Sequence, residues 1–524
     1  MNDFNNNSRL NLRARALMIA GTSSHAGKSV IATAFCRLFA ERGIRVAPFK
    51  AQNMSLNSYV TLEGGEIGRA QAAQAEAAGI EPHVHMNPIL LKPAGGVSQV
   101  VVLGEPAATL SAREYYAAKD RFWQAAAGAY DDLASRYEIV VLEGAGSPVE
   151  INLIEHDLAN YRSARHADAA VVIVADIERG GVFAQIVGTW ELTPEADRER
   201  IVGFLINKFR GDPTLLDSGL RMIESRTGKP VLGVLPYLEN LRVDQEDSLS
   251  LDDDSGSIPD VSGQDGESTD VAVVRVDSIS NFTDFDPFRR EPGVRLRFVR
   301  EARELGAPDL VIFPGSKATA SDLARLRDRG FADRIEKLAR DPDGPIIIGI
   351  CGGFQMLGDR IDDPEGVESR DPTVPGLGLL GVVTRFSPIK HRFRVTGSTR
   401  TGPIASVVRG YEIHMGRTDR RPDVEPWIEL VREPSGETIA DGAVDPSGRI
   451  FGTYIHGIFD NRLFFNQLID LLRKRRGLSP VDPERGRAFH AARSDRYAPI
   501  AEALRTHVDL ATIDRALAHS GRTP

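Results

Sequence analysis

The most conspicuous reactive group in the sequence is a cysteine, Cys351, within the glycine-rich run 349–358. The apolar residues 345–350 before it predict a buried strand, and the apolar residues 354–357 after it predict the start of a helix. Glycines permit a strained strand-to-helix turn that exposes the sulfur, and a helix N-terminus favours the thiolate. We therefore interpret Cys351 as a nucleophile. The alternative is a small buried hydrophobe, the commoner fate of a free cysteine.

A histidine could serve as the base for this nucleophile. The apolar strand predicted at 450–455 delivers His456, which follows Cys351 by 105 positions. Residues this far apart become neighbours when the strands that carry them end at one edge of a sheet. The N–H groups of Gly352 and of Gly315, which follows an apolar strand at 309–313, are candidate oxyanion donors for a tetrahedral intermediate.

A second reactive stretch lies near the N-terminus, where residues 21–29 read Gly-Thr-Ser-Ser-His-Ala-Gly-Lys-Ser. An apolar strand at 16–20 precedes it, and 30–42 has helical spacing. Strand, glycine-rich loop and helix predict a phosphate-binding loop whose N–H groups cradle phosphate oxygens. The loop is one residue longer than the common pattern. The ATP-binding residues it predicts are Gly21, Thr22, Gly27, Lys28 and Ser29.

Further apolar strands follow this loop and end in polar residues. They are predicted at 139–142 before Glu143, at 169–175 before Asp176, at 201–206 before Asn207, and at 231–236. Strands that alternate with helical segments predict a parallel sheet covered by helices on both faces. Ligands bind such sheets at the carboxyl ends of the strands, where these polar residues lie.

The length of 524 residues requires more than one hydrophobic core. An Asp-, Ser- and Gly-rich stretch separates two α/β units, since a strand resumes at 270. We predict five segments, two of them parallel-sheet α/β domains: a flexible N-terminus at 1–15, the domain with the phosphate-binding loop at 16–243, an acidic flexible linker at 244–269, the domain with Cys351 and His456 at 270–465, and a helical extension at 466–524. Between the strand-to-helix turn at Cys351 and residue 450, the sequence predicts a long irregular stretch.

Composition excludes several classes of protein. The net charge of −9 gives no basic footprint for nucleic acid, and no apolar run reaches membrane-spanning length. Two cysteines and a polar N-terminus predict a cytoplasmic protein without disulfides. Lys50 and Lys92 could face a phosphate or a carboxylate, but solvated lysines are more common. His83 and His85 have no ligand cluster around them that would indicate a metal.

Both halves resemble known families. The loop at 21–29 is similar to that of dethiobiotin synthetase-like ligases, which implies a magnesium site at Ser29 and Glu143 and an adenine contact at Asn207. The second half resembles class I glutamine amidotransferases, which release ammonia from glutamine through a thioester on a cysteine. That family usually has a glutamate two residues after its histidine, where this chain has Ile458. Whether Asp460 or another acid orients His456 is open.

Together the motifs resemble the cobyric acid synthase family over nearly the whole chain. The segments that carry the resemblance are 21–29, 49–58, 142–147, 176–188, 349–358, 410–417 and 453–461. The resemblance implies amidation of the b, d, e and g carboxylates of adenosylcobyrinic acid a,c-diamide, with ATP, Mg²⁺ and L-glutamine, and no nucleic-acid or membrane partner. It implies nothing about oligomeric state.

Three alternatives are open at this point. The sister enzyme that amidates the a and c carboxylates shares both kinds of domain, although residues 49–58 favour the cobyric acid synthase family. A partition-type nucleotide switch would leave Cys351 and His456 unused. A regulatory binding protein with an inactive amidotransferase domain is conceivable because of Ile458.

Overall fold

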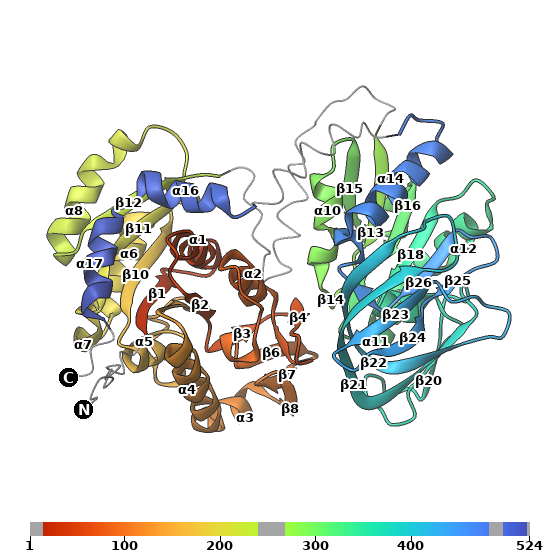
Figure 1. Cartoon of the computed structure of the whole chain (residues 1–524), viewed down its shortest axis with the longest axis horizontal. Helices are drawn as coiled ribbons and strands as arrows, with labels where there is room; N and C mark the ends of the chain where they lie inside the picture. The colour runs from red at the N-terminus through yellow and green to blue at the C-terminus, as the bar shows by residue number, and fades with distance from the viewer. Residues whose placement is uncertain (1–13, 239–267, 481–495, 521–524) are drawn as a thin grey trace, which may run out of the picture.

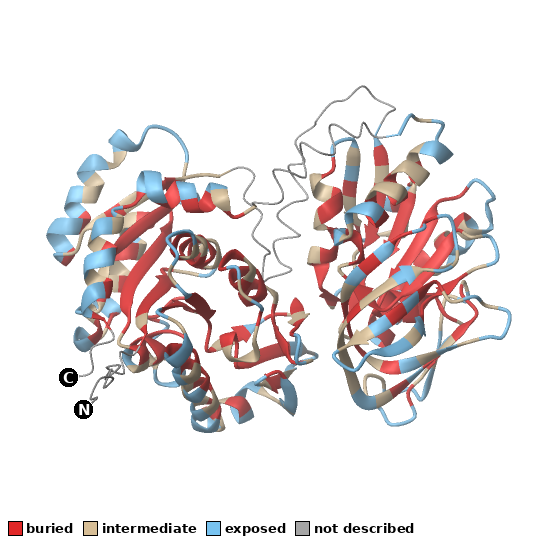
Figure 2. Cartoon of the chain, viewed as in Figure 1, coloured by how far each residue is buried: buried red, intermediate tan, exposed pale blue. Residues whose placement is uncertain are grey.

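The computed structural model describes residues 14–238, 268–480 and 496–520. Within them the chain forms two α/β domains, each built around a largely parallel sheet (Figure 1). Buried residues run along the central strands of both domains (Figure 2). The predicted fold class is thereby confirmed. Most of the predicted linker and N-terminus lies outside the described residues. No helix among those described is long and apolar enough to cross a membrane.

The first domain has a six-stranded parallel sheet in the order β12-β11-β10-β1-β9-β2. The switch of strand order beside β1 places the carboxyl ends of β1, β9 and β10 at one edge, where open α/β sheets bind ligands. The strands are β1 (Arg15–Gly21), β2 (Val46–Phe49), β9 (Ile139–Glu143), β10 (Ala170–Asp176), β11 (Ile201–Phe209) and β12 (Val231–Pro236).

Helices cover both faces of this sheet because its strands are apolar on both sides. Alternate residues of β1 point into different cores: Met18 into one and Leu17 into the other. The core around Met18 contains residues of α4 (Lys119–Arg136), α5 (Tyr161–Ala167), α6 (Val182–Leu192) and α8 (Asp217–Thr227). The core around Leu17 contains residues of α1 (Lys28–Glu41), α16 (Ala498–His507) and α17 (Leu510–His519).

The segment that we predict as one C-terminal extension divides between the two domains. Helix α14 (Arg462–Arg475) places Phe464, Phe465 and Leu468 in the core of the second domain. Helices α16 and α17 instead return to the first domain and cover its sheet beside α1 (Figure 1). The reason is their apolar faces, which include Leu504 and Ile513 and are buried there.

A small subdomain projects from the first domain toward the second (Figure 1). It contains a four-stranded sheet in the order β3-β6-β7-β8 and a hairpin of β4 and β5. Its elements are β3 (Gln52–Met54), β4 (Ser58–Val60), β5 (Glu66–Gly68), α2 (Arg69–Ala77), β6 (Ile89–Ala94), β7 (Val97–Val102), β8 (Glu105–Leu110) and α3 (Ala112–Ala117).

The second domain has a six-stranded sheet in the order β15-β13-β16-β18-β26-β25, parallel except for β25 at its edge. Its strands are β13 (Thr269–Val274), β15 (Val294–Val299), β16 (Leu310–Phe313), β18 (Ile346–Ile350), β25 (Ala443–Val444) and β26 (Ile450–Thr453). The helices around it, besides α14, are α10 (Asp286–Arg290), α11 (Thr319–Asp328), α12 (Phe331–Arg340) and α13 (Gly352–Leu357).

The prediction of an irregular stretch before 450 is wrong, because this region forms a second sheet. Strands β21 (Val382–Thr399) and β22 (Val407–Arg420) are its long central pair. Their sequences are rich in Arg, Thr and His, since much of their surface is only half-buried, and so they lack the apolar runs of the parallel strands. The other members are β19 (Arg360–Asp362), β20 (Thr373–Pro375), β23 (Ile428–Glu433), β24 (Glu437–Asp441) and β27 (Ile455–His456).

The two domains meet where the β4–β5 hairpin contacts this second sheet. An apolar cluster joins Val60 of β4 to Tyr411 and Ile413 of β22. Beside it, the buried carboxylate of Glu66 bridges two buried lysines, Lys92 of its own domain at 2.5 Å and Lys390 of the other at 2.5 Å. The interface therefore combines apolar packing with charges removed from water.

Candidate active sites

The loop between β1 and α1 has the geometry of a phosphate cradle. Gly27 precedes the helix with φ 101°, a left-handed conformation that a side chain would strain. The buried Lys28 turns back over the loop, and its Nζ donates to the carbonyl oxygens of Ser23 at 2.8 Å and Gly146 at 2.9 Å. An ammonium held by two carbonyl oxygens above a helix N-terminus is placed to exchange them for phosphate oxygens.

Glu143, at the end of β9, lies against this loop and is buried. Its Oε1 accepts hydrogen bonds from Ser29 Oγ at 2.8 Å and from Lys50 Nζ at 2.8 Å. Its Oε2 accepts from Gln74 Nε2 at 2.5 Å and from Gln71 Nε2 at 3.4 Å. Burial opposes the charge of Glu143, but Lys50 and these donors lower its pKa. The carboxylate is therefore ionised.

The pairing of Ser29 with Glu143 fits a magnesium site. Mg²⁺ takes oxygen ligands and is usually bound by one or two protein groups together with substrate phosphates and waters. Ser29 Oγ and Glu143 Oε1 supply such a pair beside the loop. Lys50 Nζ pairs with the same oxygen, Glu143 Oε1, at 2.8 Å and neutralises the carboxylate.

Asn207 lies directly behind the loop. Its Nδ2 donates to the carbonyl oxygen of Ala26 at 3.0 Å, and a Cβ on Gly27 would lie only 2.2 Å from that nitrogen. In the described structure the amide thus supports the loop from the end of β11. The adenine contact that the resemblance implies stays a prediction.

In the second domain, Cys351 lies at the sharp turn between β18 and α13. Its φ of 52° and ψ of −109° are unusual for a residue with a side chain. The turn is crowded: a Cβ on Gly353 would lie 2.0 Å from the carbonyl oxygen of Phe313. Only glycines permit this approach, and the strained backbone directs the sulfur toward β22, where Sγ lies 3.6 Å from the carbonyl oxygen of Ile413.

His456 lies in β27, shortly after the end of β26 along the chain, and is completely buried. Its Nδ1 lies 2.7 Å from Oδ2 of Asp284, and Oδ1 of the same carboxylate accepts the N–H of Gly457 at 2.9 Å. Asp284 belongs to the short 3-10 helix η5 (Phe282–Phe285), 172 positions before His456. The sequence leaves open which acid orients His456; the structure places Asp284 there, which is neither position 458 nor position 460.

The charge state of His456 follows from these neighbours. Burial alone would keep the ring neutral, but the carboxylate of Asp284 at Nδ1 and the nearby Cys351 raise its pKa to about 10. The Nε2 atom is buried and has no hydrogen-bond partner within the described residues. The ring is therefore able to carry a proton on Nε2 beside the sulfur at neutral pH.

Of the two glycines that we predict as oxyanion donors, Gly352 follows Cys351 in the turn, and Gly315 lies beside it in the short strand β17 (Gly315–Ser316). A Cβ on Gly315 would lie 3.0 Å from His456 Cε1, and one on Gly352 would lie 2.8 Å from the N atom of Ser316. The four sequence-predicted groups of the second domain, Cys351, His456, Gly315 and Gly352, are thus brought together.

Several residues at the two sites escape the sequence reasoning. Lys50 and Lys92 are buried ion-pair partners rather than solvated lysines. Asp284 lies on a turn without a motif, and Tyr411, whose ring stacks on His456 at 5.4 Å, lies in the region that we predict as irregular. The buried charge of Lys50 has one sequence signal, its place directly after the strand β2 at the ligand edge of the sheet.

Comparisons with known proteins match both domains. Residues 17–251 match the CobQ/CobB/MinD/ParA nucleotide-binding domain, and residues 270–464 match the CobB/CobQ-like glutamine amidotransferase domain. The fold and sites thus define an ATP-dependent, glutamine-hydrolysing amidoligase.

Similar full-length relatives extend the match over nearly the whole chain. A cobyric acid synthase of Pelotomaculum thermopropionicum is 49% identical over 95% of this chain and 96% of its own length. Those of Sorangium cellulosum and Desulforamulus reducens are each 46% identical, over 96% and 95% of this chain and 99% and 97% of their own lengths. The chain belongs to the cobyric acid synthase family.

Proposed function

We propose that this protein converts adenosylcobyrinic acid a,c-diamide to adenosylcobyric acid by amidating its b, d, e and g carboxylates in the cytoplasm. The observation that carries the proposal is the presence in one chain of a phosphate loop paired with a buried carboxylate and of a Cys–His–Asp site. An ATP site can activate a carboxylate, and a glutaminase site can supply the nitrogen.

In the glutaminase half, Cys351 is the nucleophile. Its sulfur attacks the side-chain amide carbon of glutamine as the thiolate, with the proton already on Nε2 of His456. The N–H groups of Gly352 and Gly315 stabilise the oxyanion. The imidazolium then protonates the leaving nitrogen, ammonia departs, and water hydrolyses the thioester to glutamate. Asp284 fixes the ring and stabilises its positive charge throughout.

In the synthetase half, the loop at 21–29 holds ATP. Lys28 and the N-terminus of α1 neutralise the phosphates, so that a corrinoid carboxylate can take the γ-phosphoryl group and become an acyl phosphate. Ammonia attacks the activated carbonyl carbon, and phosphate leaves. Ser29 and Glu143 are the residues that would hold Mg²⁺, which neutralises phosphate charge when it is bound. Lys50 keeps Glu143 ionised and in place.

Asp284 removes the main argument for an inactive amidotransferase domain, since the missing glutamate at 458 has a replacement. A partition-type switch would leave this buried triad without a use. The sister a,c-diamide synthesis is the alternative that the test below must separate.

The experiment incubates the protein with ATP, Mg²⁺, glutamine and either cobyrinic acid or its a,c-diamide, and weighs the products. We expect four carboxylates of the a,c-diamide to become amides. No mass change on the a,c-diamide with either glutamine or ammonia would refute the proposal. Amidation of cobyrinic acid that stops at the diamide would identify the sister activity.

A further inference from the structure

One corner of the first domain, formed by Asn57 and Ser58, contacts residues of the second domain that surround His456. Ser58, the first residue of β4, is fully buried. Its N–H donates to Oδ1 of Asn281 at 2.9 Å, and its carbonyl oxygen accepts the hydroxyl of Tyr411 at 3.0 Å. Both partners belong to the second domain. A third bond, from Lys92 Nζ to Ser58 Oγ at 3.0 Å, fixes the corner to its own domain.

The neighbouring residue makes a reciprocal contact. Asn57, also fully buried, accepts the N–H of Phe282 on its Oδ1 at 3.0 Å. Asn281 and Phe282 begin the turn that carries Asp284, and Asn281 has a left-handed φ of 52°. Such a conformation is costly for a residue with a side chain unless its surroundings hold it. Two hydrogen bonds from the other domain do so here.

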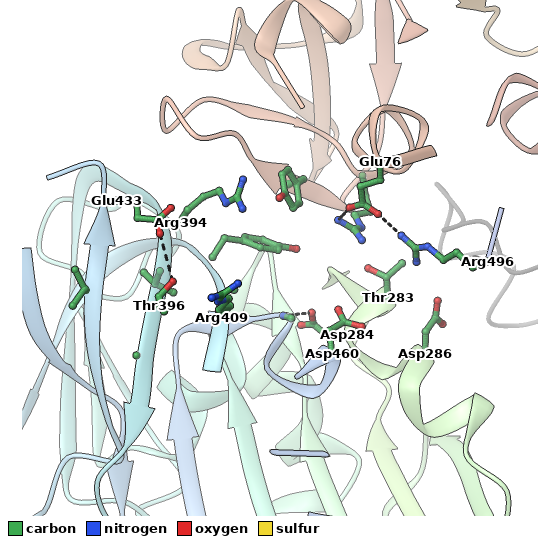
Figure 3. A pocket seen from close by; sticks show the side chains of 18 of the residues that line it. Glu76, Thr283, Asp284, Asp286, Arg394, Thr396, Arg409, Glu433, Asp460 and Arg496 are labelled. Carbon is green, nitrogen blue, oxygen red and sulfur yellow. Dashed lines mark hydrogen bonds and ion pairs between the residues drawn. The ribbon is translucent and has the colours of Figure 1, made fainter. Parts of the chain in front are cut away.

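These contacts lead to the two residues that hold His456. Asp284 binds Nδ1 of the ring, and Tyr411 stacks on its face at 5.4 Å and 23°. Asp284 and Tyr411 also line a cavity of about 910 Å³ between the domains, together with Glu76 of α2 (Figure 3). Figure 3 shows Asp284 on the side of the amidotransferase domain, facing residues from the ATP-binding domain.

We propose that Asn57 and Ser58 of the ATP-binding domain are positioning residues for glutamine hydrolysis, holding Asp284 and Tyr411 against His456. This rests on the proposed role of Cys351 and His456. His456 keeps its proton near the sulfur only while Asp284 is in place. Loss of the hydrogen bonds from Asn57 and Ser58 therefore slows glutamine hydrolysis, although no group that touches glutamine has changed.

The experiment uses the full-length protein and three variants. Tyr411→Phe removes the hydroxyl bonded to Ser58 but keeps the ring on His456. Asn57→Ala removes the acceptor of the Phe282 N–H from the opposite domain. Tyr59→Phe is the matched control: it makes the same change in the ring that packs on Tyr411 at 5.4 Å, whose hydroxyl has no hydrogen bond in the described ranges. Glutamine hydrolysis is measured from pH 6 to 11 or so, together with ammonia-driven amidation.

We expect kcat for glutamine hydrolysis to fall about 3- to 10-fold in Tyr411→Phe and roughly 10- to 100-fold in Asn57→Ala, where a buried N–H loses its acceptor. The alkaline limb of the pH profile should move to lower pH, since His456 loses the effect of Asp284. Ammonia-driven amidation should stay within about twofold of wild type, and Tyr59→Phe should leave every rate unchanged.

Two results would overturn the inference. One is wild-type glutaminase kinetics and an unmoved alkaline limb in Tyr411→Phe, the variant that threatens folding least. The other is an equal loss of ammonia-driven amidation, which would show general damage. Failure of the proposed function looks different, because glutamine hydrolysis would then survive Cys351→Ala.

Discussion

The two sites of this protein are built in different ways. The phosphate cradle is one loop of consecutive residues, 21–29, and its main partner Glu143 lies on the strand next to β1. The glutaminase site takes Cys351, His456 and Asp284 from three separate segments. In addition, the turn that bears Asp284 is held by the other domain.

This difference has a physical consequence. A loop whose shape is set by its own glycines and by an adjacent strand keeps its geometry whether or not the domains are docked. A catalytic histidine whose acid is held across an interface does not. We therefore expect the ATP site to tolerate changes at the domain interface and the glutaminase site to be sensitive to them.

The largest effects should come from separating the two half-reactions. Cys351→Ala should lower glutamine-driven amidation by about 10⁴-fold or more, because no other group can form the thioester. Ammonia-driven amidation should remain. Lys28→Ala should lower both by roughly 10²- to 10³-fold while glutamine hydrolysis continues, since it removes only phosphate charge neutralisation. Rates are measured from corrinoid amide and glutamate formed.

A loss of ammonia-driven amidation in Cys351→Ala would contradict the division of labour between the domains. The same holds if Lys28→Ala spared amidation with either nitrogen source.

The next effect concerns the acid that orients His456. Asp284→Asn should lower kcat for glutamine hydrolysis by about 10²- to 10⁴-fold, since the amide neither fixes the ring nor stabilises its charge. The pKa of His456, about 10 beside Asp284, should fall because burial then acts without a compensating carboxylate. The alkaline limb of the rate profile should follow it downward.

Asp460→Asn is the matched control, because Asp460 lines the same cavity without bonding the imidazole in the described structure. It should keep a near-normal rate. If Asp460→Asn were the more damaging change, the assignment of the acid to Asp284 would be wrong.

The same contrast explains why the sequence predicts the phosphate loop more completely than the glutaminase site. Residues 21–29 are consecutive, so their pattern carries the geometry with it. Cys351 and His456 follow apolar strands of one parallel sheet, and strand order alone brings them together. Asp284 has no such signal, because its contact depends on how the turn at 281–285 folds back on β27. Strands β21 and β22 escape prediction because half-buried strands lack the apolar runs that identify β18 or β10.

The smallest effect tests the interface itself through its buried charges. Glu66 lies between Lys92 and Lys390, and these two lysines lower its pKa despite burial; burial in turn lowers the pKa of Lys390 to about 7. Glu66→Gln leaves two buried lysine side chains without a carboxylate, and should reduce the free energy of unfolding by about 3–5 kcal/mol. Denaturant unfolding measures this loss.

Glu105→Gln makes the same substitution at the same interface, where the carboxylate pairs with Arg392 at 2.5 Å but is 68% exposed. Water screens this pair, and its loss should cost less than about 1 kcal/mol. Equal losses in the two variants would show that burial at Glu66 does not strengthen the contact between the domains. A loss confined to Glu66→Gln, accompanied by slower glutamine hydrolysis at unchanged ammonia-driven amidation, would tie domain docking to the glutaminase and leave the phosphate cradle independent of it.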